Sequence, residues 1–268
     1  HRIYPREATQ DVDVVTTYLI EKGLISPRIL RTKDNDIVVN KYGFLWRMMT
    51  YIDGISYDKV ENPQIAREAG RIAGLFHATL TNWNYPFKFV NNDWHDTLRY
   101  VNRLRSIQPG YNGTKKWNDL SPLVEEIITM YYGLLPLPLE QVHIIHGDLK
   151  INNIRFKPNG EAICLLDLDG VQRGSILAEI GDAVRSWCNV ESPISENSRL
   201  NIEFFEAMMR GYLPQVKGVI AENLLRNISH SAATIAFELA ARFLEDAFRE
   251  FYFKLDEVNF SDLYTQNV

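Results

Sequence analysis

A strand-turn-strand segment inside an otherwise helical chain most constrains what this sequence can fold into. The runs INNIRF and EAICLLD are typical of strands, and KPNG at residues 157–160 joins them with turn-forming residues. Apolar residues recur at helical spacing before it, in SPLVEEIITMYYGLL, where Ser121 is the expected N-cap, and again after Gly181. The pattern predicts an α+β fold in which one hairpin is embedded in a mainly helical part.

The N-terminal region has a different pattern. VDVVTTYLIEKG places apolar residues on one helical face and ends at Gly23, and PRILRT, DIVVN and GFLWRMMTYI then read as short strands. A helix is expected next in PQIAREAGRIAGLFHATL, with His77 at the margin of its apolar face as a core histidine rather than a ligand. We therefore expect a small sheet with one helix, followed by a helical part.

Composition excludes several classes of partner. At 268 residues the chain suits one large domain or two small ones. Lys and Arg number 29 against 34 Asp and Glu, a formal net charge of −5, so no broad basic surface is expected for a nucleic acid. No stretch supplies the ~20 uninterrupted apolar residues of a membrane span, and the first residues do not read as a signal peptide. Cys164 and Cys188 form no disulfide or metal pattern. A small-molecule partner and a cytoplasmic location are expected.

The motifs HGDLKINN and LLDLDG carry the residue types that phosphoryl transfer needs. The reaction requires positioned metal ions, a group that orients the attacking hydroxyl, and positive charge on the transferred phosphate. Kinases place a catalytic Asp five residues before a metal-binding Asn, with a further Asp at the end of the next hairpin. Here these are Asp148, Asn153 and Asp167. Lys150 could neutralise the γ-phosphate, and Asp169 is an auxiliary Mg²⁺ ligand or a structural acid.

Two other interpretations of these motifs stay open. Each polar side chain taken alone could serve only the structure, by capping a turn or ending a strand. LLDLDGV could instead open a phosphatase site of the haloacid dehalogenase type, with Asp167 attacking phosphorus. That site needs parallel strands after the motif, whereas the sequence after Gly170 reads as helix. The combined pattern favours adding phosphate over removing it.

The motifs resemble those of the aminoglycoside phosphotransferase and choline kinase superfamily, and within it N-acetylhexosamine 1-kinase and its relatives. The likeness runs from WRMMTYIDG to nearly the last residue. Three further segments carry it: WHDT with Arg99, GDAVR at residues 181–185, and a tail from Glu238 to Asp246 of the form E-x-x-x-R-F-L-x-D.

The resemblance implies a protein-kinase-like bilobal fold with ATP and Mg²⁺ in its cleft. Residues 1–52 would form a small N-terminal nucleotide-binding lobe with the hinge, incomplete in this sequence. Residues 53–268 would form the large, mainly helical lobe that carries catalysis and acceptor binding.

The resemblance also implies where the nucleotide binds. Met49, Thr50 and Tyr51 would form the hinge that offers backbone groups to adenine. HRIYP resembles the strand that usually carries an ATP-binding lysine, and it has Arg2 at that position. Arginine can hold phosphate oxygens with two donors at once. A glycine-rich loop over the phosphates would have to precede His1.

The acceptor pocket is expected beside Asp148. Its implied lining is Trp94, His95, Arg99, Asp182 and Arg185, although Asp182 and Arg185 could equally form a structural ion pair. The implied activity is transfer of the γ-phosphate of ATP to a sugar hydroxyl, with the anomeric hydroxyl of an N-acetylhexosamine as the leading acceptor. Choline, homoserine or an aminoglycoside as acceptor, and a catalytically silent pseudokinase, are the alternatives.

Overall fold

The computed structural model of the chain describes residues 4–138, 142–189, 191, 198–251 and 253–268. Within them the α-helices are α1 (Arg6–Glu21), α2 (Pro63–Leu80), α3 (Thr97–Arg105), α4 (Gln108–Tyr111), α5 (Lys115–Gly133), α6 (Ile176–Trp187), α7 (Ile202–Val216), α8 (Glu222–Leu225), α9 (Ile228–Arg249) and α10 (Leu263–Asn267). The strands are β1 (Val39–Lys41), β2 (Phe44–Trp46), β3 (His143–Ile145), β4 (Ile154–Phe156), β5 (Ala162–Leu165) and β6 (Gln172–Gly174), and two 3₁₀ helices are η1 (Ile151–Asn153) and η2 (Leu168–Gly170).

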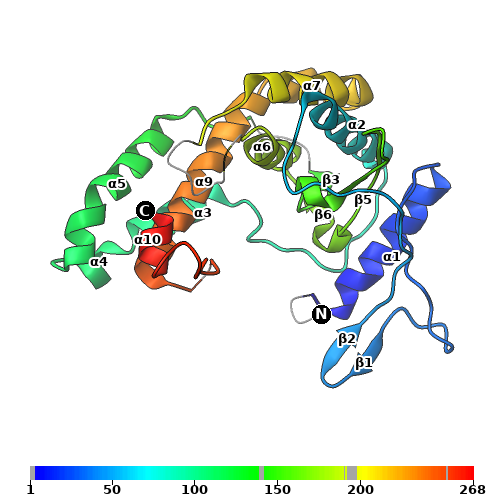
Figure 1. Cartoon of the computed structure of the whole chain (residues 1–268), viewed down its shortest axis with the longest axis horizontal. Helices are drawn as coiled ribbons and strands as arrows, with labels where there is room; N and C mark the ends of the chain where they lie inside the picture. Colours follow the sequence, from blue (N-terminus) through cyan, green and yellow to red (C-terminus); the bar gives the residue numbers. More distant parts are fainter. Residues whose placement is uncertain (1–3, 139–141, 190, 192–197, 252) are drawn as a thin grey trace.

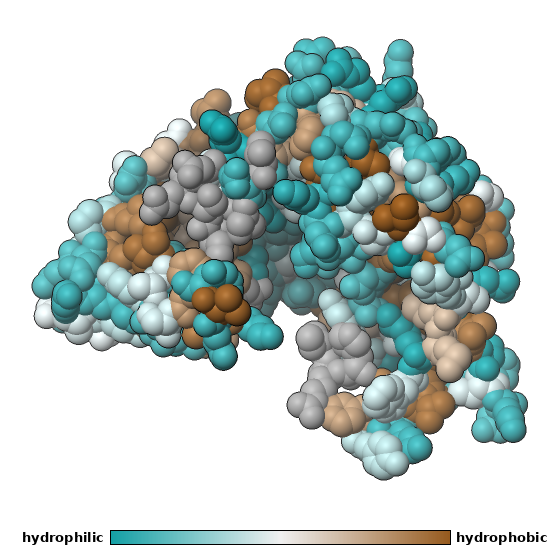
Figure 2. All heavy atoms as spheres, in the orientation of Figure 1, coloured by the Kyte–Doolittle hydropathy of each residue, from teal (hydrophilic) through white to brown (hydrophobic). Residues whose placement is uncertain are grey.

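The elements are arranged as an arch (Figure 1). Helix α1 and the β1–β2 hairpin form one foot, and α4, α5 and α10 form the other, with α2, α6, α7 and the remaining strands between them. The space-filling view in Figure 2 shows the molecule deeply hollowed between the two feet. The fold is the predicted α+β, bilobal one. None of the described helices is long and apolar enough to cross a membrane.

The N-terminal sheet is built on a tight hairpin. Strands β1 and β2 pair antiparallel, and Tyr42 and Gly43 between them have φ values of 57° and 75°. Two-residue hairpin turns need this left-handed conformation because it matches the twist of the strands. The strand expected in PRILRT is reduced to an isolated bridge between Ile29 and Met49.

The central hairpin is confirmed. Strands β4 and β5 pair antiparallel, with Ile154 opposite Leu165, and the Gly160 amide donates to the Lys157 carbonyl across the turn at 2.9 Å. The first residues of the expected INNIRF strand form η1 instead. The hairpin therefore begins directly after the 3₁₀ turn that carries Asn153.

The expectation that helix follows Gly170 directly was wrong. Strand β6 comes first and pairs antiparallel with β3, with His143 opposite Gly174. The pairing could not be predicted locally, because β6 is three residues long and its partner lies far away in the sequence. All strand pairs of the described sheets are antiparallel, so they do not supply the parallel strands of the phosphatase alternative.

The expected cap of α5 was also wrong. The helix begins at Lys115, and the Thr114 hydroxyl oxygen accepts a hydrogen bond from the Trp117 amide at 3.1 Å. Ser121 and Pro122 lie inside the helix. Burial of Trp117 and of apolar residues further along the same face stabilises the earlier turns, which outweighs the local preference of a Ser-Pro pair for a helix start.

Two clusters of buried apolar side chains form the interior. The larger is built by α1, α2, α6, α7 and the central strands, and the smaller by α3, α5 and α9. Packing of α6 against α9 joins them. Cys164 and Cys188 are buried as expected, and burial raises the pKa of these thiols to about 11 and about 12.

Candidate active site

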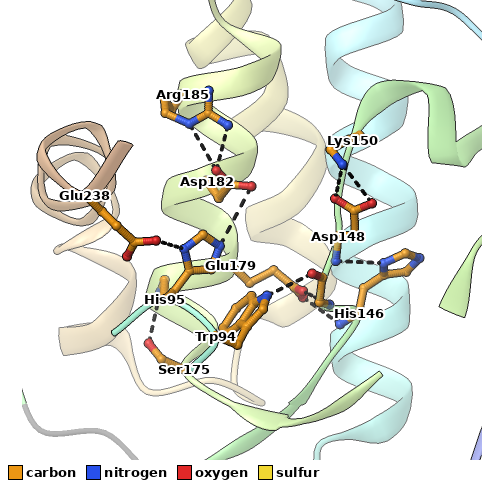
Figure 3. A network of polar contacts seen from close by, with 12 residues as sticks. Trp94, His95, His146, Asp148, Lys150, Ser175, Glu179, Asp182, Arg185 and Glu238 are labelled. Carbon is orange, nitrogen blue, oxygen red and sulfur yellow. Dashed lines mark hydrogen bonds and ion pairs between the residues drawn. The ribbon is translucent and has the colours of Figure 1, made fainter. Parts of the chain in front are cut away.

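The His146-Gly147-Asp148 loop lies directly after β3 and is held by several hydrogen bonds (Figure 3). His146 Nε2 lies 2.7 Å from the Leu166 carbonyl oxygen, and the Asp148 amide donates to His146 Nδ1 at 3.3 Å. Both contacts are satisfied if Nε2 carries the proton. The histidine ring therefore ties the loop to the end of β5.

Asp148 is only partly buried, with 34% of its side chain exposed. Lys150 Nζ lies 2.8 Å from one carboxylate oxygen and 3.0 Å from the other. Asn153 Nδ2 donates to the Asp148 carbonyl at 2.9 Å and to its carboxylate at 3.1 Å. The three residues expected to share a catalytic loop are thus in direct contact through the Asn153 amide nitrogen and the Lys150 ammonium group.

Asp167 lies at the end of the hairpin, where the Leu166 amide donates to the Asn153 carbonyl at 2.7 Å. Its φ of 55° and ψ of 56° are left-handed, a strained conformation for a residue with a Cβ. Burial raises the pKa of Asp167, and the neighbouring charges of Asp169 and Asp148 raise it further. A divalent cation would relieve this repulsion, so the residues fit a metal site.

Asp169 is 5% exposed and forms an ion pair with Arg47, the residue that follows β2. The pair joins the N-terminal sheet to η2, against which α1 also packs. Nothing local in the sequence indicates it, because Arg47 lies in an apolar run that reads as an ordinary strand.

Glu179 of α6 supports the catalytic loop from inside the core. Its carboxylate accepts hydrogen bonds from the amides of His146 at 3.1 Å and Gly147 at 2.6 Å. His77 Nε2 lies 2.5 Å from the same carboxylate, and His77 Nδ1 lies 2.9 Å from the Tyr212 hydroxyl. His77 is a buried core residue, as expected, but the sequence analysis missed Glu179. The signal was a lone acid on an otherwise apolar turn of α6, ILAEIG.

Trp94 and His95 link the catalytic loop to the α6 and α9 helices. The Trp94 indole donates to the Gly147 carbonyl at 2.8 Å, so its polar edge is used by the protein. His95 has a left-handed φ of 49°, and its Nδ1 lies 3.0 Å from Glu238 Oε1 of α9. Figure 3 shows the His95 ring next to Asp182 and Glu238, with Trp94 beside it on the side of Asp148.

The α6 end of this network is an ion pair. Arg185 donates to one oxygen of Asp182 from Nε at 3.0 Å and from a terminal nitrogen at 2.7 Å, and His95 Nε2 lies 3.9 Å from the other oxygen. Arg242 also pairs with Glu238, at 3.4 Å. Each carboxylate here has a cationic partner.

Arg99 is not brought into this network. It is 47% exposed and pairs with Asp93 on the surface. Arg99 itself lines a shallow surface pocket, together with Asp96, Leu98, Asn102, Arg103 and Ser106, and none of these residues belongs to HGDLKINN or LLDLDG.

The expected hinge lies next to a cavity of about 640 Å³ in the N-terminal lobe. The lining includes Tyr4, Val38, Arg47 and Met49. The Thr50 amide donates to the Arg28 carbonyl at 2.9 Å, while Tyr51 is largely exposed. Arg2 lies outside the described residues.

The bilobal fold, with an Asp-bearing loop followed by a hairpin that ends in a second Asp, defines a protein of the kinase-like phosphotransferase class. The sequence agrees: residues 2–222 match the family model described as the phosphotransferase enzyme family. The chain therefore belongs to the phosphotransferase enzyme family, and it is a small-molecule kinase of that group.

Solved structures with the same fold include several small-molecule kinases. The amicoumacin kinase hAmiN, in complex with AMP-PNP, Ca²⁺ and Ami, has a TM-score of 0.60 at 14% identity, over 95% of this chain and 74% of that one. An ethanolamine kinase of Plasmodium vivax has a TM-score of 0.58 at 14% identity, over 100% and 72%. A microcompartment-associated aminopropanol kinase has a TM-score of 0.53 at 13% identity, over 93% and 83%. At these identities the likeness establishes the fold.

Proposed function

We propose that this protein is an ATP-dependent kinase that phosphorylates a hydroxyl of a neutral sugar, with the anomeric hydroxyl of an N-acetylhexosamine as the leading acceptor. The observation that carries the kinase part is the contact of Asp148 with Asn153 and Lys150, at the start of the hairpin that ends in Asp167. Phosphoryl transfer depends mainly on positioning and electrostatics, and these residues supply both.

Asp148 is the proposed base. Its carboxylate is accessible to an acceptor hydroxyl, because a third of the side chain remains exposed. It would orient that hydroxyl and take its proton as the new oxygen–phosphorus bond forms and the bond between the γ-phosphorus and the oxygen of the departing ADP breaks. Lys150 would move from Asp148 to the transferred phosphoryl group, since its own side chain is 58% exposed and unconstrained by packing.

Asp167 and Asn153 are the proposed Mg²⁺ ligands. When bound, the ion would neutralise the negative charge that develops on the phosphates of ATP during transfer. The fit is supported by the solvent-accessible carboxylate of Asp167, whose pKa is raised by partial desolvation and by the charges of Asp169 and Asp148. It is also supported by Asn153, whose amide nitrogen is used by Asp148 and whose oxygen is left for the ion.

The nucleotide is proposed to bind in the N-terminal lobe of residues 1–52, against the larger lobe of residues 53–268. The mainly apolar cavity beside Met49 suits an adenine ring, with backbone groups of Met49 to Tyr51 as its polar contacts. Arg2 would hold phosphate oxygens in place of the usual lysine.

The acceptor is proposed to lie between Asp148 and the His95–Asp182 end of the network. Asp182 is neutralised by Arg185, and Glu238 is contacted by His95 and Arg242, so this region offers hydrogen bonds without a strong excess of negative charge. A polycationic aminoglycoside needs an acidic rim, and choline needs an aromatic cage. The compensated network suits a neutral sugar better than either. Trp94 and Arg99 are weaker candidates for sugar contact, because each already has a partner in the protein.

The test is ADP release by the purified protein with ATP and Mg²⁺. The acceptor panel holds N-acetylglucosamine, N-acetylgalactosamine, glucose, choline, homoserine, ethanolamine and kanamycin. Turnover on an N-acetylhexosamine, with a phosphorus NMR signal coupled to the anomeric proton, supports the full proposal. Turnover confined to an amino alcohol or an aminoglycoside overturns the sugar assignment and keeps the kinase. Nucleotide binding without turnover on any acceptor supports the pseudokinase alternative instead.

Two variants separate the roles. Asp148→Asn should lower kcat by roughly 10²–10⁴-fold, the usual contribution of a general base, with little change in ATP binding. Asp182→Asn should act mainly on the acceptor, raising its KM more than it lowers kcat. Glu206→Gln is a matched control, because Glu206 belongs to an exposed ion pair with Arg210 on α7.

A further inference from the structure

Arg47 and Asp169 form an ion pair that joins the two lobes at the edge of the proposed metal site. The Asp169 side chain is 5% exposed and that of Arg47 is 19% exposed, so both are largely removed from water. An arginine keeps its charge at any working pH, and breaking a buried ion pair leaves an uncompensated charge in the interior. The pair is therefore a permanent feature of the site.

Three carboxylates gather in this region, and their partners differ. Lys150 pairs with Asp148, and Arg47 pairs with Asp169. Within the described part of the chain, no Lys, Arg or His side chain forms an ion pair with Asp167, and the charges of Asp169 and Asp148 act on it. Of these three carboxylates, Asp167 is the one without an ion pair among the described residues, while the charges of His146 and Arg47 act on its pKa in the opposite sense to those of the two acids.

The arrangement of ligands points the same way. Among the described residues, no three His, Cys, Asp or Glu side chains converge so that they could hold one ion. Asp148, Asp167 and Asp169 thus do not form a three-carboxylate site. Because Asp148 is paired with Lys150 and Asp169 with Arg47, a metal at Asp167 would take its remaining ligands from the Asn153 amide, the nucleotide and water. This suits Mg²⁺, which keeps several waters when bound to proteins.

We propose that Arg47 is the permanent counter-cation of Asp169 and thereby keeps Asp169 out of the metal site. Asp167 and Asn153 are then the protein ligands of the divalent cation, and Asp169 is a positioning residue that anchors η2 to the N-terminal sheet. This inference rests on the proposed function, since it takes the divalent cation at Asp167 from it. Of the two roles that the sequence leaves open for Asp169, it favours the structural acid over the auxiliary ligand.

The test measures the Kd of Mn²⁺, used in place of Mg²⁺, from the electron paramagnetic resonance signal of the free ion, with saturating ADP. The decisive variant is Arg47→Gln with Asp169→Asn, which removes both charges and keeps both shapes. If Asp169 is not a ligand, the Kd of Mn²⁺ for this double variant should stay within about threefold of the wild-type value. The reason is that two uncharged side chains replace an ion pair whose charges already cancel. Asp167→Asn should weaken binding by about tenfold or more, since a charged ligand is lost.

The single variant Arg47→Gln gives an opposite and independent prediction. It leaves Asp169 ionised and unpaired beside Asp167, so Mn²⁺ should bind roughly threefold to tenfold tighter. Arg47→Lys keeps the charge and should behave like the wild type. Arg210→Gln is the control, because it changes the net charge equally at an exposed pair on α7 and should leave the Kd unchanged.

The outcomes separate this inference from the proposed function. A double variant that loses Mn²⁺ as strongly as Asp167→Asn makes Asp169 a ligand and overturns the inference while keeping the metal site. Unchanged binding in Asp167→Asn, or no Mn²⁺ binding by the wild type, removes the metal assignment itself and the inference with it. If Arg47→Gln fails to fold, the double variant and Arg47→Lys still decide.

Discussion

His77 Nε2 lies 2.5 Å from Glu179 Oε2, and neither side chain is more than 1% exposed. The same carboxylate accepts the amide protons of His146 and Gly147, which precede the proposed base Asp148. A charge in the centre of the larger core thus fixes the backbone of the catalytic loop. The loop can remain open to substrate on one side because it is held from the other.

Replacing Glu179 by glutamine should test this support. The change keeps the shape of the side chain but removes its charge and turns one acceptor into a donor that faces backbone amides. We expect the free energy of unfolding to fall by about 3 kcal/mol, as when one partner of a buried pair is removed. Urea denaturation measures it. Glu206→Gln, at an exposed pair, should cost less than about 0.5 kcal/mol, and equal losses in the two variants would contradict the assignment.

The pH dependence of stability gives a second check. Burial alone would raise the pKa of Glu179, but the hydrogen bond and charge of His77, with the Gly147 amide, hold that pKa below its usual range. The stabilisation is therefore fully present above the unfolded-chain pKa of about 4.3 and is lost as the pH falls through the lower, folded-state pKa. The stability difference between wild type and Glu179→Gln should shrink from about pH 6 to about pH 3. A difference that grows on acidification would refute this.

Gly147 should tolerate no side chain. Its φ is +85°, and a Cβ would lie 2.3 Å from the Gly170 carbonyl oxygen, which belongs to η2 and cannot move freely. We expect Gly147→Ala to lower kcat at least about tenfold, since the new methyl group would push the Asp148 loop away from η2, which directly follows Asp167. Gly23→Ala is the matched control, with the same φ of +85° and no atom within 4 Å of its Cβ. It should cost only about 1 kcal/mol of stability and leave kcat unchanged.

The Trp94 indole should act through its hydrogen bond to the Gly147 carbonyl. Trp94→Phe keeps an aromatic ring and removes the donor, so we expect kcat to fall roughly fivefold to tenfold, the equivalent of about 1 kcal/mol. Trp83→Phe is the control, because Trp83 stacks on Tyr18 of α1, with ring centroids 4.1 Å apart, and lies outside the proposed sites. Steady-state kinetics of both variants should show a loss only for Trp94→Phe. A rise in acceptor KM alone would favour sugar stacking by Trp94 instead.

The parts of the site that could be predicted are those with a local cause. Asp148, Asn153 and Asp167 are separated by one loop and one hairpin, and the KPNG turn fixes how that hairpin closes. The helical spacing of apolar residues likewise predicted α2 over the residues that it occupies, because the apolar face of this helix is continuous. In these segments, neighbouring residues alone determine the geometry.

The parts that could not be predicted depend on partners distant in sequence. Arg47 meets Asp169, and Glu179 meets His77, only after the lobes and helices have packed. Strand β6 forms because it pairs with β3. Helix α5 starts earlier than expected because Trp117, in its first turn, is buried. Local sequence patterns do not predict such contacts, because they do not say which distant residues the folded chain brings together.

The division of the interior into two apolar clusters has a consequence for motion. Asp182 lies on α6, whose apolar residues belong to the larger cluster, and Glu238 lies on α9, which contributes to the smaller one. His95 contacts both carboxylates, at the boundary between the two clusters. Clusters packed separately can open at different free energies. We expect slow opening at this boundary to widen the proposed acceptor side, while the Asp148 loop and the proposed metal ligands, which rest on the larger cluster, keep their geometry.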